Sequence, residues 1–440
     1  MVVRPGGLDL DREPDLVPAD LVRTFSVFGS VGTIAGYENV ASLVADNFTG
    51  VVTHVHQTGR PVPPGVNVLL FPYDFRRSVR DAAHQLADAV RGALGEDPVG
   101  RPVVVLAHSM GGLVARYWIG PLGGWSVCAA LLTLGTPHRG APKAVDWLLN
   151  GPGIGPLRHP GVRRVLRGWP SVYELLPQYP AVWDSVAGHE VELTTLPTPS
   201  PYAETFARMA ADGRAVHEDI ATAWSELPAD AVPDVVPYFG RGHATPNLLT
   251  LQENGRLTIT KDDPPWRGNV GWRGDGTVPV LSAVPRELGE HRGAWRGVAE
   301  RHGPIATTPS FVDQLLSWSG EPVPTRGEAP DRPWLGLDLE DVVPAGAEFD
   351  IGVRVQPDEL TADAVRLAVT PVPPTGPPAF VGPLTAVGPD WSISVPPLAP
   401  GRYRVDLEAR LTANVESVFG VTDLVVLDPA EEAEAAEASA

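Results

Sequence analysis

The chain has 440 residues, 43% of them hydrophobic, which suffices for more than one domain with an apolar core. Its formal net charge of −19 argues against nucleic acid as a partner and against tight docking on anionic membranes, because no broad basic face can release counterions. The single cysteine, Cys128, excludes an intrachain disulfide.

The beginning of the chain carries no targeting signal. Residues 1–11 contain no apolar h-region, and no run approaches the roughly 18 apolar residues of a membrane span. The sequence as written therefore predicts a cytoplasmic protein, or a secreted one if an upstream start adds a signal peptide.

Strand and helix patterns alternate through the first half of the chain. Such alternation predicts a parallel sheet with helices on both faces. The expected helices cover 38–46, 79–95 and 110–118, and the expected strands 66–71, 102–107, 128–134 and 235–240.

Residues 103–114 form an apolar run that breaks at Ser109 and then turns helical. A serine on a sharp strand-to-helix turn needs small residues two positions to either side, and Ala107 and Gly111 provide them. This pattern, A-x-S-x-G here instead of G-x-S-x-G, indicates the nucleophile elbow of an α/β-hydrolase. It predicts Ser109 as nucleophile and the backbone N–H of Met110, at the positive end of the next helix, as one oxyanion donor.

A serine nucleophile requires a carboxylate and a histidine, which follow it in that order in this fold. The acid is predicted to be Asp275, which lies between two glycines in the loop 274–279. An Asp-Gly hairpin turn would also explain this loop, and Asp262 and Asp263 are nearby alternatives.

Two histidines follow Asp275 in the chain, His291 and His302. His302 lies in a loop before a helix-like stretch at 310–318, from where an imidazole can reach back over the strand ends. His291 lies in a polar run and is interpreted as a surface histidine. His302 is therefore the predicted base.

The pattern over 140–227 is helical and irregular, with aromatic residues interleaved with prolines. Its position after the fourth strand predicts a cap that shapes an acyl pocket. A basic cluster before Trp169 is interpreted as a solvated helix face, with a phosphate or headgroup contact as the alternative. Its members are Arg158, Arg163, Arg164 and Arg167.

Over about residues 20–320 the chain resembles the lecithin:cholesterol acyltransferase and lysosomal-phospholipase-like branch of the α/β-hydrolases. Four segments carry the resemblance beyond the elbow, and the first has phenylalanine where the family has tryptophan. They are Tyr73-Asp74-Phe75-Arg76, Leu134-Gly135-Thr136-Pro137-His138, Pro170-Ser171 with Leu175-Leu176-Pro177, and 274–279.

The resemblance implies acyl-ester chemistry on lipids, with the acyl group passed to an alcohol or to water and transient contact with a lipid interface. Cysteine pairs, His-Glu-x-x-His and the phosphate-binding Gly-x-x-x-x-Gly-Lys are absent from the sequence, so no metal and no cofactor are expected. The alternatives are an esterase for non-lipid esters, or a catalytically impaired relative that binds lipid or a protein partner.

The second oxyanion donor is a departure from the family pattern. Relatives open with an apolar strand that ends in a Pro-Gly-x-x-Gly-Ser-like loop. Here Met1 is followed by Val-Val-Arg-Pro-Gly-Gly and then by the acidic run 8–20, and no such strand is expected before that run. Gly29-Ser30 resembles what the family places after that loop, and is the less favoured candidate for the donor. We therefore expect that the written start is too late and that the native protein carries a further strand.

The pattern changes after about residue 320, which ends the predicted hydrolase domain of 1–320. A proline-rich linker is expected over 321–334, and an acidic, disordered tail over 429–440. Between them, over 335–428, apolar residues alternate with polar ones between Pro/Gly turns, which predicts an immunoglobulin-like β-sandwich. We expect this domain to be a docking or spacer module whose partner is unknown.

Overall fold

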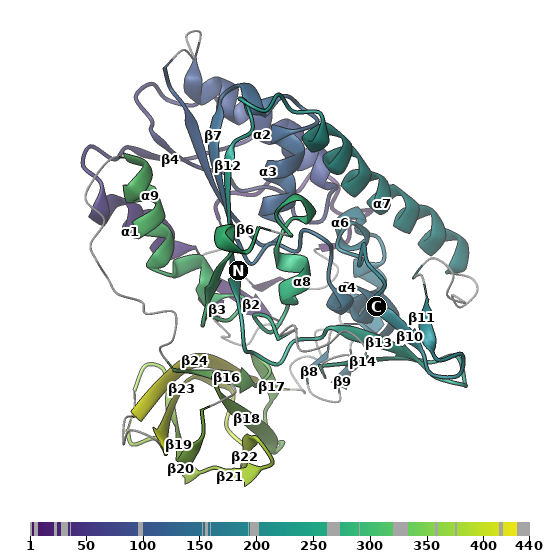
Figure 1. Cartoon of the computed structure of the whole chain (residues 1–440), viewed down its shortest axis with the longest axis vertical. Helices are drawn as coiled ribbons and strands as arrows, with labels where there is room; N and C mark the ends of the chain where they lie inside the picture. The colour runs from purple at the N-terminus through teal and green to yellow at the C-terminus, as the bar shows by residue number, and fades with distance from the viewer. Residues whose placement is uncertain are drawn as a thin grey trace.

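The structure of the protein is a computed structural model of the whole chain. An α/β part forms most of the molecule, and the C-terminal strands gather into a separate β-sandwich against one end of it (Figure 1). The described residues are 2–3, 8–21, 24–27, 34–35, 37–95, 100–151, 153–154, 157–158, 160–191, 193, 202–261, 273–289, 291–319, 333–356, 360–374, 376–412 and 417–428.

The central sheet is parallel, as predicted, with the strand order β15-β12-β7-β6. Its strands are β6 (Val103–His108), β7 (Cys128–Leu134), β12 (Asp234–Gly240) and β15 (Arg296–Val298). A second parallel pair joins β4 (Thr53–Val55) to β5 (Val68–Leu70).

Helices cover both faces of this sheet. Side chains of β7 point alternately to the two faces and pack into a separate core on each. Leu131 packs with residues of α2 (Val79–Leu94) and α3 (Gly111–Ile119). Leu132 and Leu134 pack with residues of α1 (Glu38–Asn47) and α9 (Ser310–Ser319) on the other face. The predicted helices and strands thus agree with the observed ones to within about two residues at each end. β4 and β15 were not predicted, because neither lies in an apolar run like that of β5.

The N-terminal segment differs from the expectation. β1 (Val2–Val3) pairs in parallel with β2 (Thr24–Val27), which pairs with β3 (Ile34–Ala35). An apolar strand does precede the acidic run 8–20, contrary to the expectation, because pairing with β2 makes a strand of two residues that show no period of their own. Residues 4–7, which follow this strand, lie outside the described residues. Gly29 and Ser30, the less favoured candidates for the oxyanion donor, lie outside the described residues.

The predicted cap region contains helices, and also strands that the sequence did not indicate. The helices are α4 (Pro142–Asn150), α5 (Pro160–Leu166), α6 (Pro170–Glu174) and α7 (Ala203–Ser225). The strands are β8 (Gly153–Ile154), β9 (Leu157–Arg158), β10 (Val182–Asp184) and β11 (His189–Val191). β10 and β11 are three residues long and pair with each other in an antiparallel hairpin. They form a sheet of order β11-β10-β13-β14 with the later strands β13 (Leu248–Leu251) and β14 (Leu257–Thr260), in which β10 pairs in parallel with the distant β13.

The C-terminal part is a sandwich of two sheets, as predicted, with the orders β16-β18-β22-β21 and β17-β24-β23-β19-β20. All its pairs are antiparallel except the parallel pair of β17 and β24. The strands are β16 (Trp334–Asp338), β17 (Val342–Pro344), β18 (Phe349–Gln356), β19 (Ala362–Pro371), β20 (Phe380–Pro383), β21 (Thr385–Val387), β22 (Asp390–Val395), β23 (Gly401–Leu411) and β24 (Ser417–Leu427).

Along β23 every second side chain is buried between the two sheets, from Tyr403 to Leu411. Trp334, at the end of the predicted linker, already belongs to β16, whereas the predicted tail lies outside the described residues. Within the described ranges, no helix has both the length and the apolar character that a membrane crossing requires.

Candidate active site

The turn between β6 and α3 has the geometry of a nucleophile elbow. Ser109 has φ +51°, and it is the one non-glycine residue in the described part of the chain with a positive φ. Its backbone N–H donates to the carbonyl of Leu134 at the end of β7 (2.9 Å), which ties the turn to the neighbouring strand. Met110 is the N-cap residue of α3, directly beyond the serine.

The structure brings together the three predicted site residues from three separate segments. His302 Nε2 lies 3.0 Å from Ser109 Oγ, and His302 Nδ1 lies 2.7 Å from Asp275 Oδ2. An ionised carboxylate only accepts, so Nδ1 carries the proton and Nε2 is left to accept from the serine hydroxyl. His291 is exposed, and Asp262 and Asp263 lie outside the described residues.

Asp275 is buried, with 2% of its surface exposed, and its carboxylate makes three hydrogen bonds. Burial alone raises the pKa of its carboxyl, but the charge and hydrogen bond of His302 and the backbone N–H groups of Val278 and Thr277 outweigh burial, so the pKa lies below its ordinary value. These N–H groups donate to Oδ1 at 2.9 Å from Thr277 and 2.7 Å from Val278. Oδ2 therefore remains for His302.

Gly135, in the segment after β7 that carries part of the resemblance, makes room for this pair. It has φ +59°, and a Cβ added there would lie 2.9 Å from Asp275 Oδ2 and 3.2 Å from His302 Nδ1. A side chain at this position would push the acid and the base apart. Glycine is required here for both its φ and the space that it leaves.

Two residues that were not predicted as site residues, His108 and Tyr37, hold His302 in place. His108 Nε2 lies 2.7 Å from the carbonyl oxygen of His302, so Nε2 donates, and Nδ1 accepts from the hydroxyl of Tyr37 at 2.6 Å. Burial, and then the nearby His302, lower the pKa of His108 to about 3, which keeps it neutral. The histidine before the nucleophile is visible in the sequence, but its partners are not, because they lie 71 and 194 residues away.

Because several histidines are buried and neutral, we expect the free energy of unfolding of the protein to fall in mild acid. Burial lowers the pKa of His108 to about 3 and those of His217 and His243 to about 4. In the unfolded chain a histidine binds its proton near pH 6.5, so between about pH 6.5 and 4 the unfolded chain binds more protons. The free energy of unfolding should therefore fall with pH there, by up to about 1.4 kcal/mol per histidine per pH unit.

Urea unfolding at about pH 7 and about pH 5 measures this effect. His217→Gln should flatten the dependence, because glutamine does not titrate and can still donate to the carbonyl of Glu174 that His217 contacts at 2.7 Å. The exposed His291→Gln is the matched control and should leave the slope unchanged. Equal slopes for the wild type and His217→Gln would contradict the prediction.

The basic cluster near Trp169 is largely occupied by the protein itself. Arg163 Nη1 donates to the carbonyl of Leu149 (3.2 Å) and Arg167 Nε to that of Leu148 (2.7 Å). Arg164 is exposed, and the side chain of Arg158 lies outside the described part. In the segments that the structure describes, no group of three or more His, Cys, Asp or Glu residues could hold a metal ion.

A comparison with known protein families matches residues 34–230 to the family described as lecithin:cholesterol acyltransferase. This segment is a lecithin:cholesterol acyltransferase family domain. The resemblance predicted from the sequence is confirmed for these residues. Ser109 and Gly135 lie within the family domain, whereas Asp275 and His302 follow it, so the choice of acid and base depends on the geometry described above.

The curated relatives include GPI inositol-deacylases from two strains of Cryptococcus neoformans var. neoformans serotype D. Each is 31% identical over 153 residues, or 32% of this chain. The match spans only 20% and 17% of the lengths of these relatives.

Among solved structures, the chain is similar to Bacillus licheniformis lipase BlEst2. The mature form covers 57% of this chain and 77% of its own, with 14% identity and a TM-score of 0.32. The propeptide form covers 81% of this chain and 85% of its own, with 12% identity and a TM-score of 0.31. Likeness at these scores carries no argument about activity.

Proposed function

We propose that this protein is a serine hydrolase or acyltransferase that acts on lipid acyl esters through an acyl-enzyme. The observation that carries the proposal is the chain of hydrogen bonds from Ser109 through His302 to Asp275, at a serine held at a positive φ. The lecithin:cholesterol acyltransferase family domain that contains Ser109 supports the same chemistry.

In the first half of the reaction Ser109 Oγ attacks the carbonyl carbon of the ester, and His302 Nε2 takes the hydroxyl proton. The negative charge on the carbonyl oxygen is stabilised by the backbone N–H of Met110 at the start of α3. When the tetrahedral intermediate collapses, the bond to the leaving alcohol breaks and His302 returns the proton to that alcohol. The acyl group remains on Ser109.

In the second half water or an acceptor alcohol attacks the acyl-enzyme, and His302 removes its proton. Ser109 leaves and regains a proton from His302. Water yields a carboxylic acid, and an alcohol yields a new ester. Asp275 keeps the proton on Nδ1 and stabilises the imidazolium in both halves.

The substrate class follows from the family and from the character of the cap. The relatives are named for the removal of an acyl group from inositol, and this supports acyl esters as substrates. Lys143 of α4 lies 3.3 Å from Thr277 of the acid loop and 5.9 Å from the ring of Trp147. Helix α4 of the cap, which carries Trp147, is thus joined to the acid loop through Lys143.

A series of p-nitrophenyl esters from acetyl to palmitoyl tests the substrate class. Each added methylene that is buried contributes about 0.8 kcal/mol, so kcat/KM should rise up to about fourfold per methylene until the acyl site is full. The background rate of Ser109→Ala is subtracted. A strict preference for acetyl esters would contradict the lipid assignment and favour an esterase for non-lipid substrates.

A further inference from the structure

Residues 242–244 join the sandwich to the acid loop by backbone hydrogen bonds. The N–H groups of the first two residues of this segment donate to the carbonyls of Arg273 (3.0 Å) and Gly274 (3.1 Å) at the start of the acid loop. The third, that of Ala244, donates to the carbonyl of Leu337 in β16 (3.0 Å). Backbone hydrogen bonds thus run from the first strand of the sandwich through residues 242–244 to Arg273 and Gly274, directly before Asp275.

His243 connects the sandwich to the loop that carries the base. Its Nδ1 accepts from the backbone N–H of Leu337 (3.1 Å), so the proton is on Nε2, which donates to the carbonyl of Ala299 (2.9 Å). The imidazole is buried, with 2% of the residue exposed. Ala299 is three residues before His302, so the ring ties β16 to the loop of His302, while the backbone N–H of the same residue bonds to Gly274 beside Asp275.

Arg301 precedes His302 and points its guanidinium to the sandwich. Its Nη2 donates to the carbonyl of Leu339 (2.5 Å) and pairs with Asp341 Oδ1 (2.7 Å). The arginine side chain is only 8% exposed. The next residue, His302, donates its backbone N–H to the carbonyl of Asp275 (2.9 Å), so the contacts of Arg301 and the acid–base pair belong to one continuous network.

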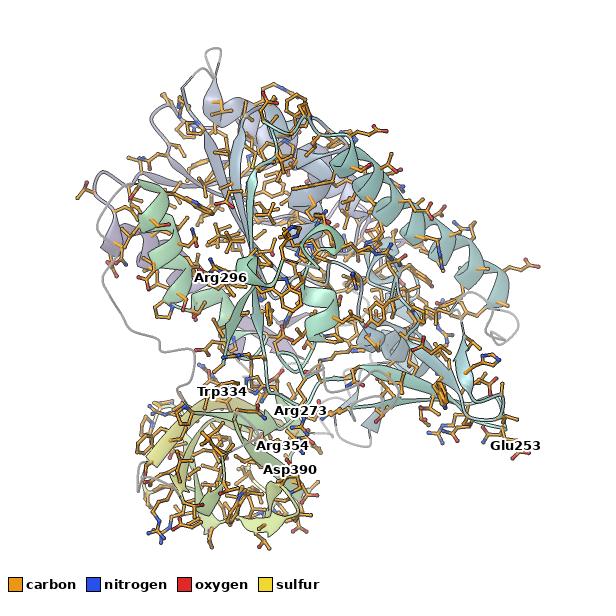
Figure 2. The ribbon with its side chains drawn as sticks, in the orientation of Figure 1. Glu253, Arg273, Arg296, Trp334, Arg354 and Asp390 are labelled. Carbon is orange, nitrogen blue, oxygen red and sulfur yellow. The ribbon has the colours of Figure 1, made fainter. Side chains whose placement is uncertain are left out.

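The two parts also fit closely. A Cβ added to Gly336 in β16 would lie 2.1 Å from the carbonyl oxygen of Gly242. The guanidinium of Arg241 lies 4.2 Å above the ring of Trp334, at the boundary that Figure 2 shows. Lys261 adds two ion pairs across the boundary, to Asp338 (2.7 Å) and Glu340 (3.0 Å).

We propose that the sandwich positions the acid and base loops of the active site, with His243, Arg301 and Asp341 as positioning residues. This inference rests on the proposed function for its kinetic test. Asp275 and His302 come from different loops, and their 2.7 Å contact requires both loops to be held in place. The contacts of β16 supply this restraint, so the sandwich is more than the docking or spacer module that the sequence predicts.

Gly336→Ala in the full-length chain tests the proposal. The added methyl must displace the carbonyl of Gly242, whereas Gly376→Ala, where a Cβ meets nothing within 4 Å, is the matched control in the same domain. Misplacement of a catalytic group by about 1 Å costs about 100-fold, so we expect kcat of Gly336→Ala to fall about 10- to 100-fold at unchanged KM. The control should retain the wild-type kcat.

A second measurement does not depend on activity. The proton between His302 Nδ1 and Asp275 should give a low-field proton NMR resonance that His302→Ala removes. It should shift or vanish in Gly336→Ala and persist in Gly376→Ala. Wild-type protein that shows the resonance but no ester hydrolysis would refute the proposed function and leave the positioning role intact, whereas its absence from the wild type would refute the positioning role.

Asp341→Ala covers the case in which Gly336→Ala does not fold, because the Asp341 side chain is 44% exposed. We expect a fall in kcat of about 10-fold that Asp341→Glu restores, since glutamate can still pair with Arg301. A folded Asp341→Ala or Gly336→Ala protein with wild-type kcat and an unchanged resonance would overturn the inference.

Discussion

Ser109→Ala should abolish ester hydrolysis, with kcat lower by about 10⁶-fold, because only binding and the oxyanion donors remain without the attacking oxygen. The elbow itself should persist, since alanine is no larger than serine. Hydrolysis of p-nitrophenyl octanoate and labelling with a fluorophosphonate measure the loss, because the probe reacts only with an activated serine.

The matched control for this variant is Ser126→Ala, at an exposed serine of the same part of the chain. It should leave hydrolysis and labelling unchanged. Mass spectrometry should locate the label on the peptide that contains Ser109. A folded wild-type protein that takes up no label would contradict the proposed function and favour a catalytically impaired relative that binds lipid or protein.

Asp275→Asn should lower kcat by about 10⁴-fold while the protein stays folded. Oδ1 already accepts the backbone N–H groups of Thr277 and Val278, so the amide oxygen of asparagine will take that position. The amide NH₂ then faces His302 Nδ1 and makes it an acceptor. The imidazole proton moves to Nε2, which can no longer accept from Ser109.

Initial rates across the pH range, with circular dichroism as a check of the fold, measure this effect. His291→Ala is the control and should change the rate little, because His291 is exposed. If His291→Ala removed the activity while His302→Ala spared it, the base would be misassigned. An active Asp275→Asn together with an inactive Asp262→Asn or Asp263→Asn would move the acid to the preceding segment.

The fold class and the nucleophile are readable from the sequence because both have local causes. The φ of +51° at Ser109 requires small residues within two positions, and these are adjacent in the chain. The alternation along β23 is likewise a property of consecutive residues. The short strands β10 and β11 have no such signal, because three residues are too few to show a period. β10 also depends on a distant partner, since Val182 pairs with Leu249 of β13.

The tertiary structure alone decides which charged and hydrogen-bonding groups meet. His302 reaches Ser109 across 193 residues, and its carbonyl takes a hydrogen bond from His108 across 194. From the sequence, His302 could be preferred to His291 as the base only because His291 lies in a polar run and His302 lies before a helix-like stretch. What the sequence by itself determined is the longer helices and strands and the candidate residues on or beside them, since these depend on short-range sterics and periodicity. Which loops contact one another, including the bond of Arg301 to the sandwich, depends on how whole layers pack, and no local pattern records that.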